Sequence, residues 1–576
     1  MALKYGDVQN QHQHPPAVKK ENFELMLEGF LFLMFIFSCL FVLSAFSSGD
    51  FLGAFQTLRT AAIFFGLLFL KLNWDWVLNK INHKTAATTE RTKEDSFAHL
   101  DHSLEVGLTT GILTERGHQA GAAGDQIIHI PFADCAQNFV CFGGTGSGKT
   151  TRFINGMLFQ MMAARTLDKQ GEREYFGGLI FDVKGDFCKS VYEIAKMVGG
   201  RPIYTVGVGA DRLKVNLLAG LTPATATDFL RSAYALGGSR SNDSVWLDSA
   251  LELTQSVLTI LEQTAAGYTI KGLYEFIFDA EKRSKFMAEA QENVSCIADK
   301  TDFEHAIYYY ENVYSKYDEK LIKSVEFTLS PVIKAFQTVE LSDAFCNTDP
   351  VKNYDLKDIL NNGDIVLVDL PLVKFGKAGK TVYTLLKLRY FNLMQSRHAD
   401  ETLNKDRFCF FLCDEYQELI SSTGSAGLSD GNFWDKSRSS RMIGIISAQS
   451  IAAFETAIGD RTKTQTILSN FVQKICFRTG EEQTIRYFSE TIGKAEVQKF
   501  THNEGSSAQW YGGNMSNNQG YSVSYVDKHV IDANLFRQLG DVPNAPIKGT
   551  TTALACLSIE GRAIDDVIML TPLFID

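Results

Sequence analysis

Short apolar runs recur along the chain, and each of them ends in polar residues. Runs of this kind predict strands buried on both faces, as in a parallel sheet covered by helices. They lie at 139–142, 179–182, 364–371, 408–412 and 442–450. Helix-compatible stretches separate them, which favours an α/β fold. Because ligands of open α/β sheets bind at the carboxyl ends of the strands, we expect the polar residues there to converge.

Residues 222–348 show a different pattern, with apolar residues at helical spacing. Positions i, i+3 and i+4 share one face of a helix, and this spacing joins Trp246, Ala250, Leu253, Val257 and Ile260. We therefore expect an all-α domain that interrupts the α/β domain. The tyrosine-rich stretch at 308–317 fits either helix packing or stacking on nucleic-acid bases, and packing is the commoner use of such residues.

Two long apolar stretches stand near the N-terminus. The first runs from Gly29 to Phe46 without a charged residue, close to the roughly 20 residues that span a bilayer. The second centres on 61–70, and lysines flank the pair on both sides. Under the positive-inside rule both flanks are cytoplasmic. We expect a two-helix transmembrane anchor at 25–80 after a cytoplasmic N-terminus at 1–24, with a cleaved signal peptide as the alternative for the first stretch.

Composition excludes two broad classes of protein. The chain has 576 residues, 45% of them hydrophobic and 21% charged, so it can form large cores and is not globally disordered. Its formal net charge of −11 argues against a protein that binds nucleic acid through overall basicity, although a local basic channel stays possible. The ten cysteines include no CxxC pair, which gives no sign of a zinc ribbon or a disulfide framework.

The sequence GGTGSGKTT directly follows the apolar run at 139–142 and precedes a helix-compatible stretch. This is a phosphate-binding P-loop in its required strand–loop–helix context. Its glycines allow successive N–H groups to face a phosphate, its lysine reaches the β- and γ-phosphates, and its first threonine is a ligand for Mg²⁺. The predicted nucleotide-binding residues are Gly143, Gly144, Thr145, Gly146, Ser147, Gly148, Lys149, Thr150 and Thr151.

A P-loop requires an acidic partner at the end of another buried strand. The run at 408–412 continues through Cys413 into Asp414 and Glu415. We expect Asp414 to hold the magnesium shell together with Thr150, and Glu415 to act as the general base that polarises the attacking water.

Other strand ends provide further candidates. Gln449 follows the run at 442–448 and is placed to sense the γ-phosphate, while Asp182 and Lys184 form either a site element or a structural ion pair. Phosphoryl transfer often uses an arginine from a neighbouring subunit, and the candidates for this role are Arg438, Arg441 and Arg478.

The order of these segments resembles the type IV coupling proteins of conjugation and secretion, the TraD/TrwB-like membrane ATPases related to the FtsK translocases. The resemblance covers nearly the whole chain. It rests on the two apolar spans, the P-loop, FDVKGDF at 181–187, KVNLLAGL at 214–221, VWLDSALEL at 245–253, VLVDLPL at 366–372, LCDE at 412–415, RSSRMIGIISAQS at 438–450 and ILSNFVQKICFRTG at 467–480.

The resemblance implies a RecA-like P-loop ATPase domain with an inserted all-α domain and a two-helix transmembrane anchor. The nucleotide-binding domain then comprises 81–221 and 349–576, with the all-α domain at 222–348 between them. ATP and Mg²⁺ are the implied ligands. Lys149, Glu415, Gln449 and Arg441 are the implied catalytic residues, and Arg441 matches the position of a finger that acts across a subunit boundary.

The resemblance also implies partners and a place in the cell. These are a homo-hexamer in the bacterial inner membrane with its ATPase domain in the cytoplasm, relaxase-bound single-stranded DNA, relaxosome or effector proteins, and the components of a secretion channel. Two alternatives remain: a coupling receptor for protein effectors, and an FtsK-like double-strand translocase.

Residues 503–525 are rich in glycine, serine and asparagine. This composition is typical of flexible segments, and we expect a mobile loop or linker there. The segment after it returns to apolar, strand-compatible patterning and is expected to complete the ATPase domain.

Overall fold

The computed structural model describes residues 100–576 except 168–170, 237–243, 296–299, 350, 422–427, 508–515, 544 and 575–576. The predicted transmembrane anchor at 25–80 lies outside the described residues. Within the described part, no helix combines the length and the apolar character needed to cross a bilayer.

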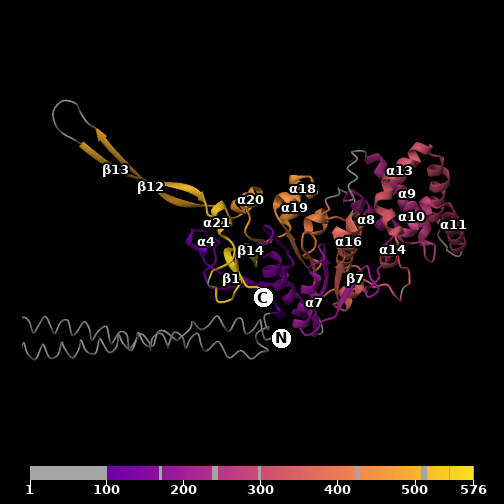
Figure 1. The fold of residues 1–576 in the computed structure, drawn as a ribbon, viewed down its shortest axis with the longest axis horizontal. Helices are drawn as coiled ribbons and strands as arrows, with labels where there is room; N and C mark the ends of the chain where they lie inside the picture. The colour runs from indigo at the N-terminus through magenta and orange to yellow at the C-terminus, as the bar shows by residue number, and fades with distance from the viewer. Residues whose placement is uncertain are drawn as a thin grey trace, which may run out of the picture. The chain divides into compact units, whose positions relative to one another are not determined.

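A large sheet forms the centre of the described chain (Figure 1). Its eleven strands follow the order β2-β1-β15-β14-β11-β3-β10-β9-β6-β8-β7. From β11 to β7 in this order, the strands are parallel to one another. They are β3 (Phe139–Phe142), β6 (Gly177–Asp182), β7 (Ile203–Gly207), β8 (Ile365–Asp369), β9 (Cys409–Cys413), β10 (Met442–Ala448) and β11 (Gln473–Cys476).

Four antiparallel strands extend this sheet at one edge. They are β1 (Ser103–Thr109), β2 (Ile127–Pro131), β14 (Thr551–Ile559) and β15 (Arg562–Leu570), and a separate small hairpin joins β4 (Arg165–Leu167) to β5 (Arg173–Tyr175). The C-terminal segment therefore completes the same sheet that holds the P-loop strand.

The predicted buried strands are confirmed. Every residue of β3, β6, β9 and β10 is buried, as expected for strands covered by helices on both faces. Strand β10 lies between β3 and β9, with Ala448 beside Phe142 and Ile446 beside Cys413. The ends of β3 and β9 therefore lie one strand apart on the same edge of the sheet.

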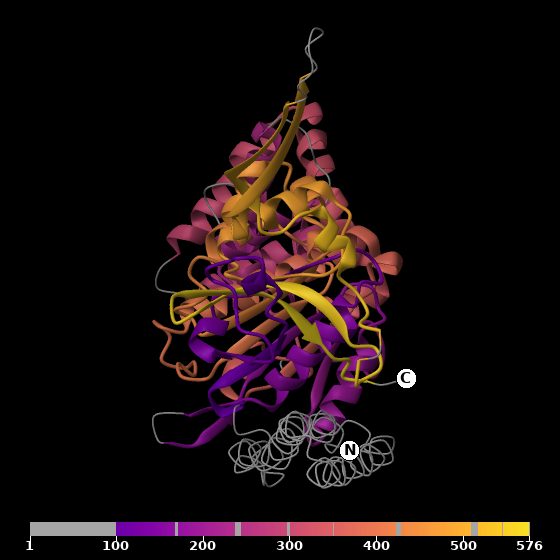
Figure 2. The same cartoon turned by 90° about the vertical axis from the view of Figure 1, so that its left-hand side faces the viewer.

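Helices flank the parallel strands (Figure 2). The longest is α16 (Leu372–Ser396), whose helical angles are interrupted at Gly376. The others are η2 (Lys149–Ile154), α4 (Ile112–Glu115), α5 (Phe132–Cys135), α6 (Asn155–Ala163), α7 (Cys188–Met197), α15 (Lys357–Asn361), α17 (Asp430–Phe433), α18 (Ile451–Ile458), α19 (Arg461–Ser469), α20 (Glu482–Ile492) and α21 (Ala533–Gln538), with the short turn η6 (Tyr416–Glu418).

The segment between β7 and β8 is helical wherever it is described as regular structure. The helix predicted from the spacing of Trp246 to Ile260 is α9 (Ser244–Glu262), and four of its five marker residues are fully buried. Its companions are α8 (Pro223–Leu236), α10 (Ile270–Phe278), α11 (Ala280–Val294), α12 (Thr301–Tyr308), α13 (Glu319–Ile333) and α14 (Val339–Phe345), with the short turns η3 (Tyr309–Val313), η4 (Tyr314–Lys316) and η5 (Lys334–Gln337).

The tyrosines of this helical region are used mainly for packing. Tyr310 makes an edge contact with Phe276 at 5.1 Å between ring centroids, and it also packs on Tyr314, which is buried. The packing interpretation of 308–317 therefore holds for these two residues.

The loop expected at 503–525 is in part a long hairpin. Strands β12 (Lys494–Ser507) and β13 (Ser516–His529) pair antiparallel along their whole length, and the hairpin projects away from the sheet (Figure 1 and Figure 2). The expectation followed composition and overlooked the alternation of YSVSY at 521–525, which has the period of a strand.

Candidate nucleotide site

The P-loop begins where β3 ends, and glycine is required at two of its positions for different reasons. A Cβ atom on Gly143 would lie 2.7 Å from both Cβ of Phe477 and Oγ of Ser147. Gly148, the last residue before η2, has a φ of 97°, a value that side chains with a Cβ atom disfavour. The close approach to Phe477 also fixes the loop against β11.

The Lys149 side chain lies within this loop. Lys149 is 7% exposed, and its Nζ donates to the carbonyl oxygens of Gly143 at 2.6 Å and Gly144 at 3.3 Å. Nearby, Oγ of Ser147 is buried and has no hydrogen-bond partner within the described part of the chain. A buried hydroxyl without a partner is costly, and a phosphate oxygen in the loop would satisfy it, so these residues fit a nucleotide phosphate.

Asp414 meets the P-loop across β10. The Thr150 hydroxyl donates to Oδ2 of Asp414 at 2.8 Å, and the Ser447 hydroxyl donates to Oδ1. The backbone N–H of Glu415 also donates to Oδ1, at 3.0 Å. A hydroxyl and a carboxylate are the oxygen ligands that Mg²⁺ prefers, so Thr150 and Asp414 fit the predicted magnesium site.

Glu415 lies beside this pair and is 5% exposed. Its carboxylate is ion-paired with Lys184 and accepts hydrogen bonds from Nε2 of Gln417 and, at 3.3 Å, from Nε2 of Gln449. Burial works to raise the pKa of Glu415, but the hydrogen bonds from Lys184 and Gln417 and the charge of Lys184 hold it below its ordinary value. Glu415 is therefore ionised at neutral pH, as a general base must be.

Gln449 occupies the position expected from the sequence. It is exposed, follows the end of β10 and reaches Glu415 with its amide. Lys184 belongs to the site as well, because its ion-pair partner is Glu415 and not Asp182.

Asp182 instead organises the turn after β6. Its two carboxylate oxygens accept the backbone N–H groups of Gly185 at 2.7 Å, and of Phe187 and Cys188 at 2.9 Å each. With Cys188 and Asp369 it forms a group whose ligand atoms all lie within 4.8 Å of one another. The Asp182 oxygens accept backbone N–H groups, and Asp369 pairs with Arg212 at 2.7 Å. The group therefore stabilises the turn after β6.

Arg441 is not brought to this site within the chain. It precedes β10 at the amino end of the strand, where its guanidinium donates to the Asp406 carbonyl at 2.5 Å. Parallel strands place that end at the opposite edge of the sheet from the P-loop of the same chain. Its role across a subunit boundary stays a prediction. Arg438 also lies at this edge, 3.9 Å from Asp134.

Arg478 lies next to the P-loop. It follows β11 by two residues, its side chain is exposed, and its carbonyl accepts the N–H of Gly144 at 3.1 Å. The strand order of the sheet, which the sequence alone does not give, places Arg478 beside the P-loop of its own chain and Arg438 and Arg441 away from it.

The sequence analysis did not identify four residues that contribute to the site or support it. Ser447 is a hydroxyl inside a fully buried strand, which is itself a signal that it has a specific partner. Lys387 and Asp430 form an ion pair of 2.7 Å with both side chains fully buried, and Tyr416 joins it. Their signal is faint, because a lysine within TLLKLRYF and an aspartate after a glycine-rich segment look like surface residues.

Comparison with known proteins connects this site to a family. Residues 410–541, which begin within β9 and end beyond α21, match the family described as the TraM recognition site of TraD and TraG. The predicted resemblance to TraD/TrwB-like coupling proteins is confirmed. A search of curated proteins gives no match.

Solved structures of the coupling protein TrwB share the fold. The unbound form of TrwB without its N-terminal 70 residues is 15% identical, with a TM-score of 0.50, over 82% of this chain and 94% of that chain. TrwB bound to the non-hydrolysable ATP analogue ADPNP is 16% identical, with a TM-score of 0.50, over 83% and 95%. The chain thus shares the RecA-like α/β fold of these structures.

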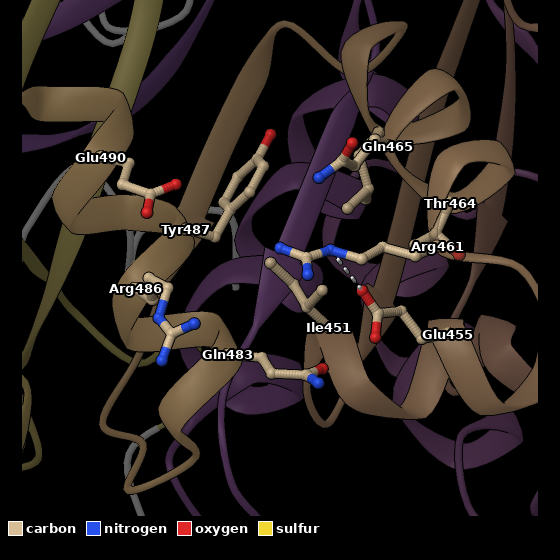
Figure 3. Close-up of a pocket in the computed structure, with 10 residues that line it drawn as sticks. Ile451, Glu455, Arg461, Thr464, Gln465, Gln483, Arg486, Tyr487 and Glu490 are labelled. Atoms are coloured by element: carbon tan, nitrogen blue, oxygen red, sulfur yellow. Dashed lines mark ion pairs between the residues drawn. The ribbon is translucent and has the colours of Figure 1, made fainter.

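A pocket lies within the part that matches the TraD and TraG family. It opens between α18, α19 and α20 and is lined by Ile451, Glu455, Arg461, Thr464, Gln465, Leu468, Gln483, Arg486, Tyr487 and Glu490. Arg461 points towards Glu455 across it, at 3.8 Å (Figure 3). It contains none of the predicted site residues, although α18 begins two residues after Gln449.

Proposed function

We propose that this coupling-protein relative is a membrane-anchored ATPase motor, which couples relaxase-bound DNA to a type IV secretion channel and drives DNA transfer in conjugation. The observation that carries the proposal is the contact of Thr150 with Asp414 beside a buried, ionised Glu415. This is the arrangement that Mg²⁺-dependent hydrolysis of a nucleoside triphosphate requires.

Each residue has a defined task in this reaction. Lys149 and the loop N–H groups bind the β- and γ-phosphates, and Thr150 with Asp414 holds Mg²⁺, which supplies positive charge against the charge of the reacting phosphates. Glu415 accepts a proton from the water that attacks the γ-phosphorus, while the bond from that phosphorus to the β–γ bridging oxygen breaks. Gln449, hydrogen-bonded to Glu415, orients the same water.

The wider proposal rests on the family and on the sequence. TrwB is named as a conjugative coupling protein and has been solved with ADP and Mg²⁺ and with an ATP analogue. The family description names recognition of TraM, which supports a relaxosome protein as a partner. A homo-hexamer, an inner-membrane position and the anchor at 25–80 complete the proposal.

Hydrolysis by the purified full-length protein tests the proposal. We expect ATPase activity that single-stranded DNA raises, that Lys149→Ala abolishes and that Glu415→Gln reduces to a small residual rate. Lys196→Ala, which removes an exposed lysine from α7, is the matched control and should hydrolyse ATP like the unaltered chain. Equal ATPase activity in all four proteins would refute the proposal that this chain hydrolyses ATP at the P-loop. Stronger stimulation by double-stranded than by single-stranded DNA would favour the FtsK-like alternative.

A further inference from the structure

Glu415 has an unusual backbone conformation. Its φ of 57° and ψ of 45° lie in the left-handed helical region, which non-glycine residues rarely occupy. Such a conformation costs energy and persists only where the residues on both sides are fixed. The position of the Glu415 carboxylate therefore depends on how its two neighbours are held.

The nucleotide site itself fixes the preceding residue. Asp414 accepts hydrogen bonds from Thr150, Ser447 and the N–H of Glu415. The backbone of Asp414 is also fixed, because Asp414 directly follows β9, which pairs with a strand on each side.

A separate network fixes the following residue. Tyr416 is fully buried, and its hydroxyl donates to Oδ1 of Asp430. Trp434 donates to the same oxygen at 3.0 Å, and Ser421 donates to Oδ2 from its N–H at 2.6 Å. The Tyr416 side chain is thereby held at a buried carboxylate 14 residues away in the sequence.

Lys387 of α16 completes the network. Its Nζ donates to Oδ2 of Asp430 at 2.7 Å and to the Leu419 carbonyl at 2.6 Å, and it lies 5.1 Å from the centroid of the Tyr416 ring. Two turns earlier on the same face, Lys380 pairs with Glu418 at 2.8 Å. Helix α16 therefore holds the whole turn that follows Glu415.

Helix α16 is itself firmly placed. Tyr390 donates to the Phe410 carbonyl of β9 at 3.0 Å. Arg389 donates to the carbonyls of Asn216 at 2.6 Å and Ala219 at 2.8 Å, in the segment that leads into α8. Helix α16 thus connects β9, the strand that leads into Asp414 and Glu415, to the start of the helical region. It therefore gives the network a rigid support.

We propose that Tyr416, Asp430 and Lys387 are positioning residues, which hold the Glu415 carboxylate where it can accept the proton of the attacking water. The inference rests on the proposed function, since it assigns a task to residues around the general base. None of the three contacts Lys149 or Thr150 in the described structure, so the network acts on the chemical step and leaves nucleotide binding alone.

Tyr416→Phe is the smallest perturbation that tests this, since it removes one hydroxyl and keeps the ring. Tyr354→Phe is the matched control, because it removes a hydroxyl that also donates to a carboxylate, Oδ2 of Asp364 at 3.0 Å, just before β8 and away from the site. In the full-length protein we expect Tyr416→Phe to lower kcat about tenfold or more, as small misplacements of a reacting group do, with an unchanged KM for ATP. Tyr354→Phe should keep the unaltered kcat.

The decisive comparison is made in the Glu415→Gln background. If Tyr416 acts through Glu415, Tyr416→Phe causes no further loss of the residual kcat there, because both changes remove the same contribution. The double variant Lys387→Met/Asp430→Asn should show the same pattern and provides a second route to the answer.

Three results would overturn the inference. One is an equal kcat in Tyr416→Phe and Tyr354→Phe, another is a loss that adds fully to that of Glu415→Gln, and the third is a change in KM alone. All three leave the proposed function standing as long as the unaltered chain hydrolyses ATP and Lys149→Ala does not. Absence of hydrolysis in the unaltered chain contradicts both.

Discussion

Replacing Lys387 by methionine should destabilise the α/β domain strongly. Lys387 and Asp430 are both 0% exposed and 2.7 Å apart, so Lys387→Met leaves a carboxylate in the core without its cation. Removal of one partner from a buried ion pair costs about 3–5 kcal/mol. That is a large share of the roughly 5–15 kcal/mol by which folded proteins are stable.

The cost should be largely recovered in the double variant. Lys387→Met/Asp430→Asn leaves no uncompensated charge in the buried network. Since both residues belong to one ion pair, their effects cannot add. We expect the double variant to be more stable than Lys387→Met alone.

Urea unfolding of the full-length protein, followed by tryptophan fluorescence, measures these differences. Trp434, one of the five tryptophans of the chain, donates to Asp430, so its share of the signal reports on the network. Lys323→Met is the control, because it removes a lysine whose ion pair with Glu319 is exposed on α13, and its midpoint should barely move. A midpoint for Lys387→Met equal to that of Lys323→Met, or a double variant as unstable as the sum of the single changes, would refute the reasoning.

Two further predictions concern the site. Lys184→Met removes the partner that lowers the pKa of Glu415 and leaves burial to raise it. In the unaltered chain, activity is lost only as the pH falls through the depressed pKa of Glu415, so in Lys184→Met the acid limb of the pH–rate profile should move to higher pH. An unmoved limb would show that Glu415 is not the base. Gly143→Ala places a Cβ atom 2.7 Å from Phe477 and Ser147 and should abolish binding of an ATP analogue in titration calorimetry, whereas Gly156→Ala in α6, with nothing within 4 Å, should bind normally.

The P-loop, its acidic partner and the buried strands were predictable because their signals are local. An apolar run followed by GGTGSGKTT predicts both a strand and a phosphate-binding loop after it. In the same way, the apolar run that ends in Asp414 and Glu415 predicts a strand followed by the acidic residues of the site. The Thr150–Asp414 contact follows once both strands are parallel and close in the sheet.

Long-range pairings were not predictable in this way. Lys184 pairs with Glu415 because β6 and β9 are neighbours, and Arg441 is excluded from its own site because β10 runs towards that site and not away from it. Both facts depend on strand order and direction. The β12–β13 hairpin was missed for another reason, since its glycine, serine and asparagine content hid the alternation that a strand requires.

Equilibrium binding of a non-hydrolysable ATP analogue, with Mg²⁺ and with a chelator, tests the central claim most directly. The account predicts that the full-length chain binds the analogue, that Mg²⁺ strengthens this binding, that Lys149→Ala abolishes it, and that Thr150→Val loses only the part due to Mg²⁺. An unaltered chain that binds no nucleotide, or a Thr150→Val variant with the full magnesium effect, would contradict the site described above.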